Sequence, residues 1–288
     1  MQQWQDEYKK YDDDRSADNS KVLFFFMLIF LSGEFILDSS VRAAAPRDAE
    51  IFDSMLELGI NETVYNYGAD PNNTYHYVKP SVVAIHAVDM FGAGSIWEIN
   101  EDFITVVTNR HVVKKWIESG TDDSVCNVIF FTGRVTEAEL LGYDEEFDIA
   151  FLKVNTGQIS DTELIRLRKV RRDEKALEAL EKGDSIIVTG SVHNIVMEAY
   201  QNNFNINGND TDVATKGYAG TVINPDIYVT DMDMKMIYAN CYAETGMSGG
   251  GAFDVYGNYI GMLTGGSDEN EAVCIRLTDI EAFYGTLK

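Results

Sequence analysis

The chain has 288 residues, of which 45% are hydrophobic and 11% aromatic, and it contains only 4 prolines. This supply of apolar side chains suits one large domain or two small ones, and it argues against an intrinsically disordered or collagen-like chain. The formal net charge of −24 argues against a nucleic-acid-binding protein, because phosphate recognition depends on lysine and arginine. The three cysteines, Cys126, Cys241 and Cys274, are too few for a disulfide scaffold and lack metal-binding spacing.

The first 78 residues are expected to precede the main folded domain. Residues 1–21 form a polar, acid-rich tail, and residues 22–37 are apolar enough to indicate membrane targeting. The favoured interpretation is a retained signal anchor; a cleaved signal peptide with a small-residue site at residues 43–45 is the alternative. A buried core helix is disfavoured because residues 22–31 are apolar on every face. Residues 38–78 are expected to form a linker with a short helix, and the domain after the linker is expected to be exported.

From residue 79 onward, short apolar segments rich in β-branched residues alternate with turns, which predicts a β-barrel or β-sandwich domain. Two helices are expected there. One covers residues 173–182, and the other begins at Thr278, with Glu281 completing a capping box. The expected strands are residues 81–86, 103–108, 125–132, 149–154, 185–189, 220–223, 236–238, 251–253 and 259–263.

The segment around Ser248 has the composition of a nucleophile loop. Residues 244–251 read Glu-Thr-Gly-Met-Ser-Gly-Gly-Gly. Small neighbours let the backbone turn sharply, expose a hydroxyl and direct amide N–H groups toward a developing oxyanion. Because Gly–Ser runs are also common in turns, this segment alone leaves a nucleophile and an ordinary turn equally open.

A serine nucleophile needs a base, and the chain has four histidines. His111 follows the predicted buried strand over residues 103–108 and leads into a polar turn, and the end of a rigid element is where a catalytic base is expected. The other three histidines are expected to have no catalytic role. His76 is expected at a polar surface, His86 in the wall of a strand, and His193 in a solvated loop.

Asp148 is the candidate for the carboxylate that orients the base. It directly precedes an apolar run over residues 149–154. A carboxylate at the entrance to a core needs a partner, because burying it alone is costly, and a histidine N–H would supply one. An ordinary turn aspartate before a strand is the alternative.

Three segments in this order resemble the trypsin-like, chymotrypsin-fold serine peptidases, and in particular their HtrA/Deg-type branch. The family elements T-N-x-H-V-V, D-I-A-x-L-K-V and G-N-S-G-G are similar to residues 108–113, 148–154 and 246–250. Weaker similarities surround them at residues 79–83, 92–96, 182–188 and 257–262. The resemblance covers residues 79–288, which we expect to form a trypsin-like serine peptidase domain without the PDZ module of HtrA proteins.

This resemblance implies an all-β fold of two packed six-stranded β-barrels with a short C-terminal helix, preceded by an N-terminal hydrophobic helix. It implies that His111, Asp148 and Ser248 are the catalytic residues of a serine endopeptidase. Such an enzyme needs neither a cofactor nor a metal.

The resemblance also implies where a polypeptide substrate binds. The oxyanion hole would lie at Gly246, Met247 and Ser248, chiefly through the backbone N–H groups of Gly246 and Ser248. The substrate would pair like an added strand with Leu263, Thr264 and Gly265, and Tyr242 would line its binding site. The oligomeric state is left open.

Met247 is a departure from the family pattern, which has an aspartate or asparagine at this position. The methionine argues against activation through a new N-terminus that pairs with an aspartate there. A catalytically silent trypsin-like domain, used as a membrane-tethered binding module, is the alternative function, because intact motifs are compatible with a blocked cleft. An α/β-hydrolase is disfavoured because its chain order is serine, acid, histidine.

Overall fold

The computed structural model of the chain describes residues 71–120, 124–191, 215–230, 232–267 and 270–288. The predicted polar tail, the apolar segment over residues 22–37 and the helix in the linker lie outside the described residues. Of the helices that the structure describes, none combines the length and the apolar character needed to cross a membrane.

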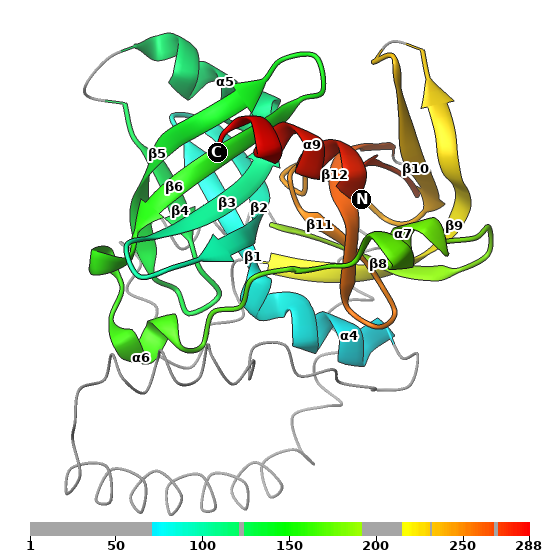
Figure 1. Cartoon of the computed structure of the whole chain (residues 1–288), viewed down its shortest axis with the longest axis horizontal. Helices are drawn as coiled ribbons and strands as arrows, with labels where there is room; N and C mark the ends of the chain where they lie inside the picture. The colour runs from blue at the N-terminus through cyan, green and yellow to red at the C-terminus, as the bar shows by residue number, and fades with distance from the viewer. Residues whose placement is uncertain (1–70, 121–123, 192–214, 231, 268–269) are drawn as a thin grey trace, which may run out of the picture. The chain divides into compact units, whose positions relative to one another are not determined.

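Six antiparallel strands close the first β-barrel, in the order β1-β2-β3-β6-β5-β4 (Figure 1). Strand β6 is buried at five of its seven positions, and a strand covered on both faces needs such a continuous apolar sequence. The strands are β1 (Val82–Ala87), β2 (Met90–Ile99), β3 (Phe103–Asn109), β4 (Cys126–Ile129), β5 (Val135–Asp144) and β6 (Ile149–Asn155).

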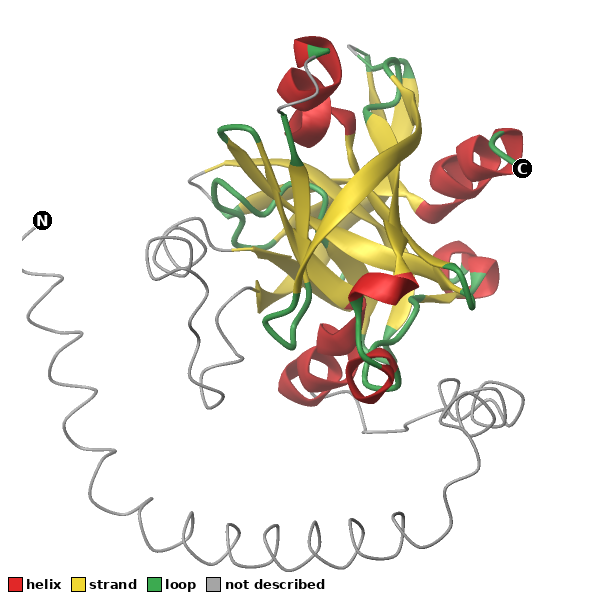
Figure 2. Ribbon diagram, turned by 90° about the vertical axis from the view of Figure 1, so that its left-hand side faces the viewer, coloured by secondary structure: helices red, strands yellow, loops and turns green. Residues whose placement is uncertain are grey.

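The second barrel has the ring order β11-β8-β9-β10-β13-β12 and is closed by pairing of β11 with β12. The short strand β7 (Arg171–Arg172), which comes from the connection between the barrels, adds to β12 in parallel. The ring consists of β8 (Ser185–Ser191), β9 (Thr215–Val229), β10 (Met234–Asn240), β11 (Gly251–Asp254), β12 (Asn258–Ser267) and β13 (Glu271–Arg276). Together the two rings confirm the predicted pair of six-stranded barrels, with the helices at the periphery of the strands (Figure 2).

Aromatic side chains fill the junction between the barrels. The indole of Trp97 in β2 contacts the rings of Phe151 in β6 and Tyr259 in β12 edge-on, with centroid distances of 5.5 and 6.0 Å. Tyr284 contacts the same indole from helix α9 (Leu277–Thr286), which packs against both barrels. Because edge-to-face pairs are directional, this cluster helps to fix the orientation of one barrel against the other.

An arginine covers this aromatic cluster. The guanidinium of Arg172 lies 4.4 Å from the ring centroid of Trp97 and forms ion pairs with Glu98 and Glu281. It therefore ties the connection between the barrels to β2 and to helix α9 through one planar group, a role that arginine serves better than lysine.

Four strands of the structure are missing from the sequence-based prediction, namely β2, β5, β7 and β13. In β5 the inward-facing residues are Thr136 and Ala138, while the outward-facing Glu137 and Glu139 are charged. Short or polar inward side chains give a weak alternating pattern, so the strand is set by its neighbours in the barrel.

The helices differ from the prediction in several places. Helix α4 (Pro71–Val78) lies at the end of the predicted linker and is followed by the 3₁₀ turn η2 (Lys79–Ser81). The helix begins at a proline, a residue favoured in the first helical turn. The hydroxyl of Tyr75 donates to the Thr215 carbonyl at 2.6 Å, so the folded unit includes residues before the predicted boundary at residue 79.

The two predicted helices are present with different bounds. Helix α7 (Glu174–Glu178) is shorter than predicted, and helix α9 begins at Leu277, one residue before the predicted cap at Thr278. A capping box forms instead at helix α6 (Asp161–Leu164), where Glu163 accepts hydrogen bonds from the backbone and side chain of Ser160. That helix follows the 3₁₀ turn η3 (Thr156–Gln158).

Candidate active site

His111 lies in the first turn of helix α5 (Arg110–Ser119), directly after β3. The sequence predicted a turn here, and the helix is therefore a correction. Val112 and Val113 are both buried, and burial of such an apolar face outweighs the weak helix propensity of valine. The helix places the imidazole at the edge of the first barrel, with 41% of the side chain exposed.

The carboxylate of Asp148 binds His111 twice. Its Oδ2 lies 2.7 Å from His111 Nδ1, and its Oδ1 accepts from the His111 backbone N–H at 2.8 Å. That N–H is one of the unpaired donors at the start of a helix, where a negative charge is stabilised. Asp148 itself has φ of 55°, a left-handed conformation that aspartate tolerates better than most residues. The sequence predicted this pair of residues, and the structure brings their side chains together.

A third donor reaches the same carboxylate from the second barrel. The Thr264 hydroxyl, in β12, donates to Asp148 Oδ2 at 2.8 Å. The sequence predicted Thr264 as a substrate-pairing residue and missed this side-chain contact. Three donors satisfy much of the acceptor capacity of a carboxylate that is only 17% exposed, so the anion can lie at the barrel junction without an adjacent cation.

Ser248 lies in the turn that precedes β11, and its backbone is held by the first barrel. The Ser248 carbonyl accepts from the Ala93 N–H at 2.8 Å, and the next residue, Gly249, donates to the Leu263 carbonyl at 2.8 Å. Gly249 has φ of 86°, and a Cβ there would overlap the Ala93 carbonyl and the Thr108 hydroxyl. Glycine is therefore required for the close approach of this turn to β2 and β3.

Ser248 is half-buried. Among the residues that the structure describes, no hydrogen bond joins Ser248 Oγ to His111. Hydrogen bonds between nucleophile and base are often long before substrate binds. The structure thus pairs two of the predicted catalytic side chains and places the third in a turn anchored to the first barrel.

The backbone N–H groups of Gly246, Met247 and Ser248 differ in their hydrogen bonding within the described residues. The Met247 N–H donates to the Glu244 carbonyl at 3.1 Å, so the prediction of Met247 in the oxyanion hole is corrected. Within the described residues, the N–H groups of Gly246 and Ser248 donate to no protein acceptor. The Gly246 carbonyl is turned inward, because it accepts from the buried Ser191 hydroxyl at 3.0 Å.

The side chain of Met247 fills an apolar site in the second barrel. It is fully buried, its Cβ packs against Gly190, and its Sδ accepts a weak hydrogen bond from the Glu244 N–H at 3.4 Å. The residue therefore shapes the turn through packing and not through charge.

The predicted substrate edge begins one residue later than expected. The Leu263 N–H donates to the Gly250 carbonyl, and its own carbonyl accepts from Gly249, both at 2.8 Å, so the backbone of Leu263 is used within the protein. Beyond it, β12 pairs with β13 on one side only, within the described part of the chain. Thr264, Gly265 and Gly266 therefore form the free edge.

Tyr242 lies beside this edge on the loop that leads to Ser248. Its side chain is 43% exposed, its hydroxyl donates to Glu244 Oε2 at 3.1 Å, and its ring centroid lies 4.8 Å from that of Tyr218. The structure therefore gives Tyr242 an anchoring contact within the loop.

The other candidate nucleophiles are buried. All three cysteines are free and buried, so each is a small side chain of the core. Burial raises the pKa of the Cys126 thiol to about 12 and that of the Cys241 thiol to about 11, so neither is a thiolate at neutral pH. His193 lies outside the described residues.

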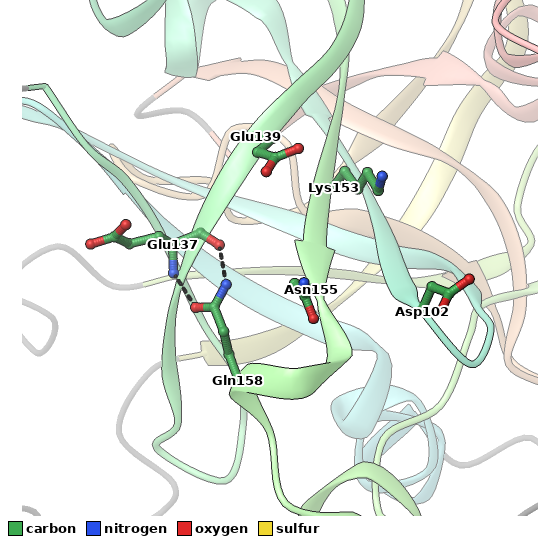
Figure 3. A pocket seen from close by; sticks show the side chains of 6 residues that line it. All are labelled: Asp102, Glu137, Glu139, Lys153, Asn155 and Gln158. Atoms are coloured by element: carbon green, nitrogen blue, oxygen red, sulfur yellow. Dashed lines mark hydrogen bonds between the residues drawn. The ribbon is translucent and has the colours of Figure 1, made fainter. Parts of the chain in front are cut away.

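A hollow on the first barrel lies far from His111 and Asp148 (Figure 3). It is at the end of β6 opposite to Asp148, about 20 Å along a seven-residue strand. The Gln158 amide closes one side of it by exchanging two hydrogen bonds with the Glu137 backbone, and Lys153 pairs with Glu139 across β5 and β6. The hollow is lined by Asp102, Glu137, Glu139, Lys153, Asn155 and Gln158.

Comparisons with known proteins agree with the fold of two β-barrels. A family model described as a trypsin-like peptidase domain matches residues 92–262, which is more than half of the chain. No curated protein matches the chain in sequence.

Two solved structures share the fold. The structure titled "Crystal structure of Deg5" has a TM-score of 0.55 and 22% identity, and the match covers 73% of this chain and 90% of that one. The structure titled "Crystal structure of Rv3671c protease, inactive form" has a TM-score of 0.53 and 19% identity, and the match covers 76% of this chain and 95% of that one. The family match and the two barrels lead to one conclusion: the chain belongs to the trypsin-like peptidase family.

Proposed function

We propose that the chain is a serine endopeptidase of the HtrA/Deg type that uses His111, Asp148 and Ser248. The observation that carries the proposal is the 2.7 Å contact between His111 Nδ1 and Asp148 Oδ2. This contact holds the Nδ1 proton against the carboxylate and leaves Nε2 as the free base. Ser248 lies in a glycine-rich turn that is hydrogen-bonded to the same barrel.

In the first half of the reaction, Ser248 Oγ attacks the carbonyl carbon of the scissile peptide bond. His111 Nε2 takes the hydroxyl proton and then gives it to the leaving amine, so that an acyl-enzyme and a free amino terminus result. The N–H groups of Gly246 and Ser248 donate to the oxyanion of the tetrahedral intermediate. In the second half, His111 takes a proton from water, the resulting hydroxide attacks the ester, and Ser248 regains its proton.

The substrate would lie as an extended strand against the free edge of β12. Thr264, Gly265 and Gly266 have backbone groups available there, and an added strand gives affinity through main-chain hydrogen bonds. Asp148 would hold the tautomer and orientation of His111 and stabilise the imidazolium that forms.

The proposal includes a location outside the cytoplasm, either tethered by residues 22–37 or released after cleavage of that segment. The support is the apolar sequence of the segment. Alkaline phosphatase is active only outside the cytoplasm, so a fusion of this enzyme after residue 288 tests the location. An active fusion is expected, and an inactive one would contradict export.

The test of the proposed activity is the hydrolysis of an unfolded protein by the full chain and by Ser248→Ala. Loss of the nucleophile of a working triad lowers kcat by about 10⁶-fold, so the variant should show only background cleavage. Ser185→Ala, at an exposed position in β8, is the matched control and should keep the wild-type rate. A folded wild-type chain that binds the unfolded protein without cleaving it would support the silent binding module instead.

A further inference from the structure

The side chain of the residue on the acyl side of the scissile bond has a defined place in this geometry. Its carbonyl carbon must lie at Ser248 Oγ, with the oxygen directed to the N–H groups of Gly246 and Ser248. In the proposed binding mode, its backbone pairs with the free edge that begins at Thr264. The side chain therefore enters between that edge and the loop over residues 242–246.

That space is almost closed by contact between Gly266 and Ala243. A Cβ built on Gly266 would lie 2.5 Å from Ala243 Cβ and 2.8 Å from the Glu271 carbonyl oxygen. Carbon atoms in contact are about 3.5–4.0 Å apart, so Gly266, even without a side chain, already packs against Ala243. A long substrate side chain has no room between them.

The loop that carries Ala243 is anchored on both sides. Before it, the Cys241 N–H donates to the Asn270 carbonyl at 2.7 Å. After it, the Glu244 carboxylate accepts from the hydroxyls of Tyr242 and Tyr218, at 3.1 and 3.3 Å. Moving Ala243 away from Gly266 would break these hydrogen bonds, so the closed space is a built feature of the loop.

The two acidic residues that the structure describes near this space, Glu244 and Glu271, have their carboxylates engaged by tyrosine hydroxyls. The Glu244 carboxylate is engaged by two tyrosine hydroxyls, and the Glu271 carboxylate accepts from the Tyr238 hydroxyl. In contrast, a Cβ built on Gly265 would meet no atom within 4 Å, so the edge is open at this position. The restriction on size therefore lies at the contact between Gly266 and Ala243.

We infer that Ala243, packed against Gly266, restricts this peptidase to substrates with glycine or alanine on the acyl side of the scissile bond. The inference rests on the proposed function and adds a substrate class to it. Each extra carbon that must be forced into such a site is worth about 10–200-fold in kcat/KM.

The test uses the full chain and a series of internally quenched peptides that differ only at the acyl residue, which is Gly, Ala, Val, Leu, Phe or Arg. The expected kcat/KM is highest for Gly and Ala, about 10-fold or more lower for Val, and about 100-fold or more lower for Leu, Phe and Arg. Ala243→Gly removes one methyl group and should raise the ratio of Val to Ala cleavage about 10-fold. Ala179→Gly, exposed at the end of α7, is the matched control and should leave that ratio unchanged.

Labelling of the same samples with an alkyl fluorophosphonate separates the two hypotheses, because this probe has no side chain to place. Labelled protein that cleaves the Leu, Phe or Arg peptide as fast as the Ala peptide overturns the size restriction and leaves the peptidase assignment standing. Unlabelled, folded protein overturns the peptidase assignment itself. Labelled protein with the expected order of rates supports both.

Discussion

Thr264 and Asp148 are 116 positions apart and lie in different barrels, yet the threonine hydroxyl donates to the aspartate carboxylate at 2.8 Å. The same carboxylate oxygen, Asp148 Oδ2, lies 2.7 Å from His111 Nδ1. The second barrel therefore helps to position the histidine through Asp148, and the free edge of β12 is fixed relative to the proposed base.

The first prediction concerns this positioning hydrogen bond. Thr264→Val keeps the shape of the side chain and removes the hydroxyl, and a hydrogen bond to a charged group contributes about 1.5–3 kcal/mol. We expect kcat to fall about 10-fold with KM within about twofold, because about 1.4 kcal/mol of lost interaction with the carboxylate corresponds to a tenfold change in rate. Steady-state kinetics with the peptide that has alanine on the acyl side of the scissile bond measures both kcat and KM.

Thr264→Ser is the matched control for this variant, since it restores the donor and removes only a methyl group. It should recover kcat to within about threefold of wild type, which corresponds to a change of less than about 1 kcal/mol in activation free energy. A folded Thr264→Val protein with wild-type kcat would show that the hydroxyl does not position the catalytic groups.

The second prediction compares two neighbouring glycines of β12. In Gly266→Ala, the new Cβ would lie 2.5 Å from Ala243 Cβ, and such overpacking costs about 1–3 kcal/mol of unfolding free energy. In Gly265→Ala the Cβ would meet nothing within 4 Å, so stability should stay within about 0.5 kcal/mol of wild type. Urea unfolding measures both, and equal stabilities would contradict the close contact between Gly266 and Ala243.

The third prediction is a pH dependence of stability. Hydrogen bonds from the Arg134 guanidinium hold the pKa of the Glu163 carboxyl below its usual value, with a further contribution from Ser160 and against the effect of partial burial. A group with a lowered folded-state pKa stabilises the protein above its unfolded pKa, about 4.3 for glutamate. That stability is lost as the pH falls through the folded-state pKa.

The variant that tests it is Arg134→Met, which keeps the aliphatic stem and removes the guanidinium. Because the Arg134 side chain is 42% exposed, we expect a loss of about 1 kcal/mol or less at neutral pH. The difference from wild type should shrink as Glu163 becomes protonated in acid. Urea unfolding at a neutral and an acidic pH checks this, and a difference that grows on acidification would refute the assignment.

The residues that carry the motifs could be predicted from the sequence because each motif is local. Asp148 precedes the continuous apolar run of β6, and His111 follows the buried strand β3, so both positions are marked by their neighbours. The spacing of the short apolar strands predicted a β-barrel or a β-sandwich, and the resemblance to the trypsin-like peptidases added the pair of barrels.

The contacts that refine the site depend on residues far apart in the chain, which a single sequence does not relate to one another. The Thr264 hydroxyl and the Asp148 carboxylate are brought together only when the two barrels pack. The N–H of Met247 is used because the loop turns back onto Glu244. Helix α5 was missed because the burial of Val112 and Val113, a tertiary effect, overrides the β-branched character of its first turn.

Mapping the site of fluorophosphonate modification tests the proposal that Ser248 is a nucleophile activated by His111. The full chain is treated with the probe, digested and analysed by mass spectrometry, beside His111→Gln. We expect one modified serine, Ser248, and a labelling rate that drops sharply in the histidine variant. Modification at another residue, or an equal rate in the variant, would contradict it.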